Sequence, residues 1–123
     1  MRLFVYGSLL SGEEHHWRLV GATRLGSCRT AARYTLVDLG EYPALLRRGN
    51  TSVCGEVYEV DAETLAALDA FEGHPHLFRR ISIRVMDGQR ALGYALQQTR
   101  LALDRPIIAS GDWKERCARQ RKR

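Results

Sequence analysis

The pattern of apolar and polar residues along this chain predicts several strands and one clear helix. Residues 3–6 are apolar and β-prone, and the run stops abruptly at Gly7, as a buried strand does when it enters a tight loop. Further extended runs bounded by turn residues predict a sheet with few helices around it. The predicted strands after the first cover residues 31–39, 44–46, 51–60, 81–85 and 91–96.

Turn residues separate these runs. Asp87-Gly88 lies between two alternating segments, which favours a two-residue type I′ turn. Gly49-Asn50 predicts another turn, after the short run 44–46.

Short helices are expected at residues 13–19 and near Asp112, the second with Ser110 as its N-cap. His15 and His16 belong to the first of these helices, and we expect both to be exposed. Neither segment has the length or the regular apolar spacing of the helix described next.

The helix begins after Asp61, a good N-cap residue, and runs through residues that favour helix. Leu65, Leu68 and Glu72 are spaced i, i+3 and i+7, so all three project from one face. The leucines must face the core, and Glu72 therefore points inward at the end of the same stripe. Gly73 then ends the helix.

A carboxylate on an apolar stripe is unusual, because burying an unpaired charge is unfavourable by several kcal/mol or forces protonation. Burial also raises a carboxyl pKa towards the range that serves proton transfer near neutral pH. Two other arrangements of Glu72 stay open: the side chain could turn to solvent, or it could pair with Arg79 or Arg80.

The loop after the first strand is the second candidate site. Gly7 can adopt a positive φ and admit a ligand close to the backbone, and successive N–H groups in such a turn can bind an anion or an oxyanion. An ordinary strand end with turn residues would have the same pattern.

Length and cysteine content limit the class of protein. A chain of 123 residues is one domain with a modest core. No apolar run approaches the ~20 residues that span a bilayer, and no signal or transit peptide is visible. Three widely spaced cysteines, without a Cys-x-x-Cys pair, do not favour a disulfide framework or a zinc site, and they fit a cytoplasmic protein.

The net charge of +5 comes from the C-terminus. Residues 114–123 hold six basic residues and one acid, so the residues before them are formally neutral. We therefore divide the chain into a domain at 1–113 and a basic tail at 114–123. A solvated tail is favoured over a phosphate-binding arm, and without interleaved aromatic residues a nucleic-acid partner is not expected.

Five segments, in order along nearly the whole chain, resemble the gamma-glutamylcyclotransferase-like proteins, in particular short bacterial members and gamma-glutamylamine cyclotransferases. Each segment alone is a weak signal, but the ordered set is specific. The segments are Val5-Tyr6-Gly7-Ser8-Leu9, Gly40-Glu41-Tyr42-Pro43-Ala44, Gly55-Glu56-Val57-Tyr58, Leu68-Asp69-Ala70-Phe71-Glu72-Gly73 and Ser110-Gly111-Asp112-Trp113.

The resemblance implies an α+β fold, a small mixed β-barrel with a few surrounding helices. It also implies cyclisation of a gamma-glutamyl amide to 5-oxoproline with release of the amine, with Glu72 as the general acid/base. No cofactor or metal is implied, the only small-molecule partner is the gamma-glutamyl substrate, and the protein is expected to be a monomer or a weak homodimer. The expected substrate-binding residues are Tyr6, Gly7, Ser8, Leu9, Tyr42, Phe78 and Tyr94.

Three of these residues carry open questions. Tyr42 and Tyr94 could line the pocket or could be core tyrosines with satisfied hydroxyls. Phe78 departs from the family pattern, in which tyrosine is common at this position, so any hydrogen bond from that hydroxyl is lost.

The chemistry is consistent with these residue types. Ring closure places the attacking amine and the carbonyl in one molecule, so no protein nucleophile is needed, and Ser8 is selected for size and loop geometry. No Gly-x-Ser-x-Gly motif is present, which disfavours a serine hydrolase. His74-Pro75-His76 could contact the amine half of the substrate; a metal site there lacks further ligands at suitable spacing.

Two other classes of function remain as alternatives. The first is a catalytically weak small-molecule binding or regulatory module with the same fold. The second is an adaptor that binds an acidic partner or nucleic acid through the basic tail.

Overall fold

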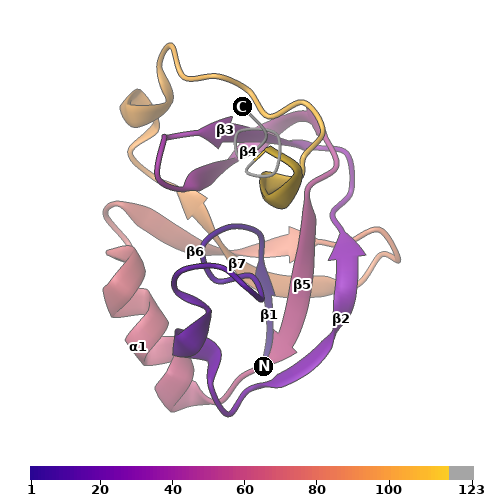
Figure 1. Ribbon diagram of the computed structural model, residues 1–123, viewed down its shortest axis with the longest axis vertical. Helices are drawn as coiled ribbons and strands as arrows, with labels where there is room; N and C mark the ends of the chain where they lie inside the picture. Colours follow the sequence, from indigo (N-terminus) through magenta and orange to yellow (C-terminus); the bar gives the residue numbers. More distant parts are fainter. Residues whose placement is uncertain (117–123) are drawn as a thin grey trace.

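The computed structural model describes residues 1–116, and the predicted basic tail beyond Arg116 lies outside this range. Within residues 1–116 the chain forms one seven-stranded sheet, helix α1, two short 3₁₀ helices and a helical segment that begins at residue 113 (Figure 1). The strands are β1 (Arg2–Val5), β2 (Thr23–Arg29), β3 (Tyr34–Asp38), β4 (Pro43–Thr51), β5 (Cys54–Glu59), β6 (Phe78–Arg84) and β7 (Arg90–Leu96), and the helices are α1 (Ala62–Glu72), η1 (His16–Leu19) and η2 (Thr99–Ala102).

The sheet is mixed, in the order β2-β5-β1-β7-β4-β3, with β6 paired to β7 off this path. The central strand β1 runs antiparallel to β5 and parallel to β7. An isolated bridge joins Thr30, just after β2, to Val85, just after β6, so the two ends of the sheet approach each other. The predicted α+β class with a small barrel-like sheet and few helices is confirmed, although the hydrogen-bonded path is open.

Helix α1 has the predicted bounds and caps. The Asp61 side chain accepts a hydrogen bond from the Thr64 N–H at 2.7 Å, and Gly73 ends the helix in the left-handed region at φ 67°. Leu65 and Leu68 are buried against the sheet. Figure 1 shows α1 on one side of the sheet with η1 beside it.

The hairpin of β6 and β7 exists, but the predicted two-residue turn is wrong. Arg84 pairs with Arg90, so the loop spans residues 85–89, and the Val85 N–H donates to the Gln89 carbonyl at 3.0 Å. A type I′ turn needs positive φ at both central residues, and here only Gly88 has it.

The turn predicted at Gly49-Asn50 is also wrong, because β4 continues through these residues to Thr51. The register with β3 shifts there instead. Gly49 has φ 146°, and a Cβ on it would lie 2.5 Å from the Tyr34 carbonyl oxygen. The glycine serves a close backbone approach rather than a chain reversal.

Strand β2 and helix η2 are absent from the sequence prediction. Strand β2 is an edge strand whose residues are exposed or half-buried, so it has no apolar alternation to detect. The helix predicted at 13–19 is reduced to the single 3₁₀ turn η1, because the backbone there forms i→i+3 bonds, such as that from the Arg18 N–H to the His15 carbonyl.

The last helical segment begins at residue 113, but its N-cap is Asp112 rather than Ser110. The Asp112 carboxylate accepts hydrogen bonds from the N–H groups of Lys114 (3.0 Å) and Glu115 (3.3 Å). Lys114 and Arg116, at the start of the predicted basic tail, contact the body of the domain through Ser11 and Asp38. The division at residue 113 stays a prediction, and we propose that the domain continues to Arg116.

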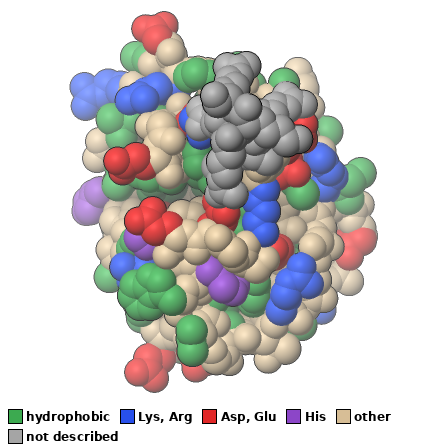
Figure 2. All heavy atoms as spheres, viewed as in Figure 1, with side chains coloured by type: hydrophobic (Ala, Val, Ile, Leu, Met, Phe, Trp, Pro, Cys, Tyr) green, Lys and Arg blue, Asp and Glu red, His purple; other side chains and the backbone are tan. Residues whose placement is uncertain are grey.

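Two apolar clusters pack on the sheet, one under α1 and η1 and the other around β3, β4 and Trp113. On the face in Figure 2, basic and acidic side chains are interspersed rather than segregated by sign. Within residues 1–116 no helix is long and apolar enough to cross a bilayer.

Candidate active site

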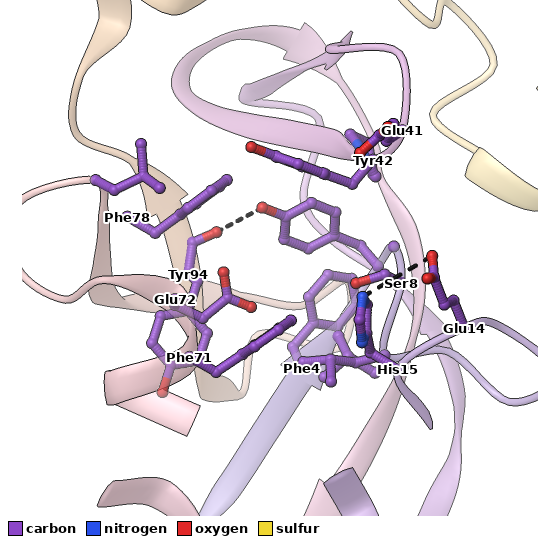
Figure 3. A pocket seen from close by; sticks show the side chains of 16 residues that line it. Phe4, Ser8, Glu14, His15, Glu41, Tyr42, Phe71, Glu72, Phe78 and Tyr94 are labelled. Carbon is purple, nitrogen blue, oxygen red and sulfur yellow. Dashed lines mark hydrogen bonds and ion pairs between the residues drawn. The ribbon is translucent and has the colours of Figure 1, made fainter. Parts of the chain in front are cut away.

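A cavity of about 260 Å³ opens between the end of β1, the end of α1 and the start of β4 (Figure 3). It brings together segments that are far apart in the chain, and all eight site residues predicted from the sequence line it. The full lining is Phe4, Val5, Tyr6, Gly7, Ser8, Leu9, Glu14, His15, Glu41, Tyr42, Pro43, Phe71, Glu72, Leu77, Phe78 and Tyr94.

Gly7 is required by a close contact with Pro43, and it does not use the positive φ that the sequence allows it. Its φ does not lie in the left-handed region. A Cβ on Gly7 would lie 2.7 Å from both Cγ and Cδ of Pro43, which is far too close. The absence of a side chain therefore lets the start of β4 pack onto the loop, and the two segments form one wall of the cavity.

The loop after β1 also provides unused backbone donors. Its carbonyls accept local bonds: Gly7 from the Leu10 N–H at 3.0 Å, and Ser8 from the His15 N–H at 2.9 Å. In the described part of the chain, the N–H groups of Gly7, Ser8 and Leu9 donate to no other group of the protein. Consecutive free N–H groups beside a cavity suit a carboxylate or an oxyanion.

Glu72, the last residue of α1, extends into the cavity between the rings of Phe71 and Tyr94 (Figure 3). Burial raises the pKa of Glu72 to about 7, and the positive charge of Arg18 opposes this only in part. Among residues 1–116 no group donates a hydrogen bond to the Glu72 carboxylate, so nothing offsets its desolvation strongly. Arg80, one partner considered from the sequence, instead pairs with Asp69 at 2.6 Å.

Tyr6 contributes a ring to the cavity and a hydroxyl to the sheet. The hydroxyl donates to the Tyr94 carbonyl at 2.6 Å and accepts from the Leu45 N–H at 3.1 Å. Burial, followed by the nearby negative charge of Glu72, raises the pKa of Tyr6 well above its usual value. Tyr6 therefore stays neutral and links β1 to β4 and β7 across the floor of the site.

Tyr94 meets both descriptions left open by the sequence. Its ring lines the cavity, while its hydroxyl points away and donates to the Asp69 Oδ1 at 2.6 Å (Figure 3). The other Asp69 oxygen accepts from Arg80. The Asp69–Arg80 pair thus fixes the Tyr94 ring beside Glu72.

Tyr42 and Phe78 form the opposite wall. Phe78 is buried, Tyr42 is 36% exposed at the mouth, and their ring centroids are 6.2 Å apart. Phe78 presents only an apolar surface to the cavity, as expected from its departure from the family pattern.

His15, Phe71 and Arg18 are site residues that sequence reasoning missed. The His15 ring lies 4.9 Å from the Phe71 ring, and the Arg18 guanidinium carbon lies 3.8 Å from the Phe71 centroid. The His15 Nδ1 is buried without a hydrogen-bond partner in the described residues. The packing of η1 against α1 makes these contacts, and no local spacing in the sequence predicts them.

Both predicted exposed histidines are instead half-buried. His15 lines the cavity, and the His16 Nδ1 lies 2.8 Å from the Leu9 carbonyl oxygen. His74 also has a structural contact, accepting a hydrogen bond from the Arg80 N–H at 3.0 Å. His74 and His76 are not among the residues that line the cavity, and the contact of this triplet with the amine half of the substrate stays a prediction.

A metal centre is not formed by the described residues, because no three potential ligands among His, Cys, Asp and Glu are grouped there. The site instead combines the Glu72 carboxyl, whose pKa burial raises, with a row of backbone donors and an aromatic enclosure. This set can bind a small polar molecule and move a proton at near-neutral pH.

Comparison with known proteins gives the family of this chain. The family profile described as Gamma-glutamyl cyclotransferase, AIG2-like, matches residues 3–115. A Vibrio cholerae relative is 43% identical over 114 residues, which cover 93% of this chain and 96% of that protein. The Gamma-glutamylcyclotransferase family protein YtfP of Escherichia coli K12 is 39% identical over 117 residues, covering 94% and 98%. A gamma-L-glutamyl-butirosin B gamma-glutamyl cyclotransferase of Niallia circulans is 38% identical over 121 residues, covering 92% and 75%.

Solved structures share the fold. The solution structure of YtfP from Escherichia coli superposes with a TM-score of 0.70 at 38% identity, covering 95% of this chain and 99% of that one. An AIG2-like protein from Mus musculus superposes with a TM-score of 0.78 at 28% identity, covering 90% and 87%. The chain therefore belongs to the gamma-glutamylcyclotransferase family of enzymes.

Proposed function

We propose that this protein cyclises a gamma-glutamyl amide to 5-oxoproline and releases the amine, with Glu72 as the group that moves the proton. The observation that carries the proposal is the Glu72 carboxyl, held in the cavity with its pKa raised by burial to about 7. A carboxyl with this pKa can accept and return a proton at physiological pH. Relatives named for gamma-glutamyl substrates, including a gamma-glutamylaminecyclotransferase from Rattus norvegicus, support the substrate class.

The reaction needs no group beyond those of the enzyme and the substrate. Glu72 accepts a proton from the substrate's α-ammonium, and the free amine attacks the γ-carbonyl carbon. A C–N bond forms in the five-membered ring, and the original amide C–N bond breaks. The protonated Glu72 then donates its proton to the departing nitrogen, so the carboxylate is restored. The ring nitrogen still carries one proton more than the lactam keeps, and the Glu72 carboxylate passes this second proton to the released amine, which leaves as an ammonium ion.

The remaining lining residues have roles that follow from their chemistry. The N–H groups of Gly7, Ser8 and Leu9 would hold the substrate's carboxylate or the developing oxyanion. The rings of Tyr42, Phe78 and Tyr94 would hold the folded glutamyl chain in the geometry that closes the ring.

A further part of the proposal concerns location. In the described residues Cys28 and Cys54 are free thiols, which supports a reducing compartment such as the cytoplasm.

The test is 5-oxoproline release from a panel of gamma-glutamyl amines by the wild type and by Glu72→Gln. The amide keeps the shape of the side chain but cannot cycle a proton, so we expect kcat to fall by at least about 10³-fold. Glu63→Gln is the matched control, because Glu63 lies on the same helix but is exposed. Normal turnover by Glu72→Gln would refute the proton role. Tight binding of substrates by the wild type without any product would favour the alternative of a binding module.

A further inference from the structure

Glu56, on β5, is a second buried carboxylate, and the proposed reaction does not use it. The residue is 6% exposed and does not line the cavity. It accepts hydrogen bonds from the Ser11 N–H (2.9 Å), the Ser11 hydroxyl (2.7 Å) and the Tyr58 hydroxyl (2.9 Å). Arg24 and Lys114 each lie 3.8 Å from one of its oxygens. Three hydrogen bonds and two nearby positive charges therefore hold this carboxylate in place, and we consider what function that serves.

The Ser11 contacts connect Glu56 to the β1–η1 loop, residues 6–15, which carries the free N–H groups of the candidate site. Ser11 follows the turn in which the Leu10 N–H donates to the Gly7 carbonyl. On its other side the loop closes on itself, since the His15 N–H donates to the Ser8 carbonyl. Ser11 is thus the point at which the middle of the loop is bonded to the sheet.

Glu56 is suited to this contact because it remains charged. Its burial would raise the pKa, but the hydrogen bonds from Ser11 and Tyr58, together with the positive charge of Lys114, outweigh burial and lower the pKa below its usual value. Hydrogen bonds to an ionised acceptor are shorter and stronger than those between neutral groups. Lys114 strengthens the set, since its Nζ also donates to the Ser11 hydroxyl at 3.3 Å.

We propose that Glu56 and Ser11 are positioning residues, which hold the β1–η1 loop so that its N–H groups face the substrate. This inference rests on the proposed function. Glu56 acts through Ser11 and touches no substrate. Without this contact the loop would keep its covalent attachment to β1 and its turns, but the direction of its free N–H groups would vary.

Ser11→Ala and Tyr58→Phe form a matched pair for the test. Each removes one hydroxyl donor from Glu56, but only Ser11 belongs to the loop. We expect Ser11→Ala to raise KM for a gamma-glutamyl amine about tenfold with kcat changed less than threefold, and Tyr58→Phe to stay within twofold of the wild type. Ser11→Thr, which keeps the hydroxyl, should restore most of the lost affinity.

Hydrogen exchange measured on a peptide covering residues 6–15 gives a second readout, independent of turnover. Ser11→Ala should accelerate exchange in this peptide several-fold, and Tyr58→Phe should not. Glu56→Gln should raise KM and accelerate exchange in this peptide more than Ser11→Ala does. Thermal unfolding of Glu56→Gln would show that this variant folds.

Wild-type kinetics for Ser11→Ala with unchanged exchange would overturn the positioning proposal, as would equal effects of Ser11→Ala and Tyr58→Phe. Failure of the wild-type protein to release 5-oxoproline would instead overturn the proposed function. In that case the exchange measurement alone decides whether Glu56 and Ser11 order the loop.

Discussion

Glu72 and Glu56 are acids of the same type, both removed from water, yet their environments act on them in opposite directions. Glu72 ends a helix and faces a cavity, with no donor to its carboxylate among residues 1–116, and burial raises its pKa to about 7. Glu56 lies within the sheet, where hydrogen bonds from Ser11 and Tyr58 and the positive charge of Lys114 outweigh the effect of burial and lower its pKa. Glu72 lacks such donors among residues 1–116, and the effect of burial on its pKa prevails.

The difference explains how one small domain can hold a reactive acid and a structural acid. An acid without partners changes protonation state near neutral pH and is available to a substrate. An acid with three hydrogen bonds stays ionised and resists displacement. We infer that the hydrogen-bond donors beside Glu56 serve to order the loop, and that the lack of donors beside Glu72 within residues 1–116 serves proton transfer.

The largest expected effect is an opposite change of stability in two glutamine variants. Glu72 has a folded pKa of about 7, above its ordinary 4.5, so its contribution to stability is greatest below pH 4.5 and falls as pH rises to 7. Glutamine does not ionise, so Glu72→Gln should be more stable than the wild type at pH 8, by up to about 3 kcal/mol. This advantage should vanish below pH 4.5.

The contribution of Glu56 to stability changes with pH in the opposite direction. Its folded pKa lies below 4.5, so it stabilises the fold above that pH and loses this contribution as pH falls. Glu56→Gln should be less stable by about 2 kcal/mol at pH 7, because donors to a charged acceptor lose their partner. Urea unfolding of both variants at pH 4, 7 and 8 checks the pair, and a shift of equal sign in both would break the comparison.

The next effect concerns the pH dependence of turnover. If Glu72 accepts the proton, kcat/KM should follow its ionised form, with a midpoint near pH 7. Below this midpoint the rate should fall about tenfold per pH unit, or roughly 50-fold between pH 7 and pH 5. A midpoint near 4.5 would mean that Glu72 titrates as a solvated acid, and the proposed contrast with Glu56 would fail.

The smallest expected effect comes from the arginine beside each acid. Arg18 lowers the pKa of Glu72, so Arg18→Gln should move the midpoint of kcat/KM upward and reduce activity at pH 6.5 about threefold. Arg24 lies 3.8 Å from Glu56, so Arg24→Gln is the matched control and should leave the midpoint unchanged. Equal shifts in both variants would point to the overall charge of the protein rather than to the local contact.

Helix α1 is the element for which the local sequence pattern predicts the structure best. Its N-cap, its ending glycine and the inward direction of Glu72 all follow from spacing within one segment, and the structure confirms them. Strand β1 and the class of the fold were predictable for the same reason, since a short apolar run followed by a glycine is a local signal.

The errors lie where a distant segment decides the local structure. The sequence allows Gly7 a positive φ, but the ring of Pro43 is what excludes a side chain there. Gly49 was expected to turn the chain, but it lets β4 pass close to Tyr34. His15 was expected to face solvent, but it packs against Phe71. One sequence contains no record of such contacts, because they arise only when segments far apart meet.

Residue order along the chain is enough to place an acid on the buried face of a helix and donors in a loop after the first strand. It does not say that these two features share one cavity, nor that Ser11 donates hydrogen bonds to Glu56. Those relations depend on how β1, β4 and α1 pack, and packing is a property of the whole fold. The pKa of a carboxyl depends on its surroundings, so the contrast between Glu72 and Glu56 emerges only once the chain has folded.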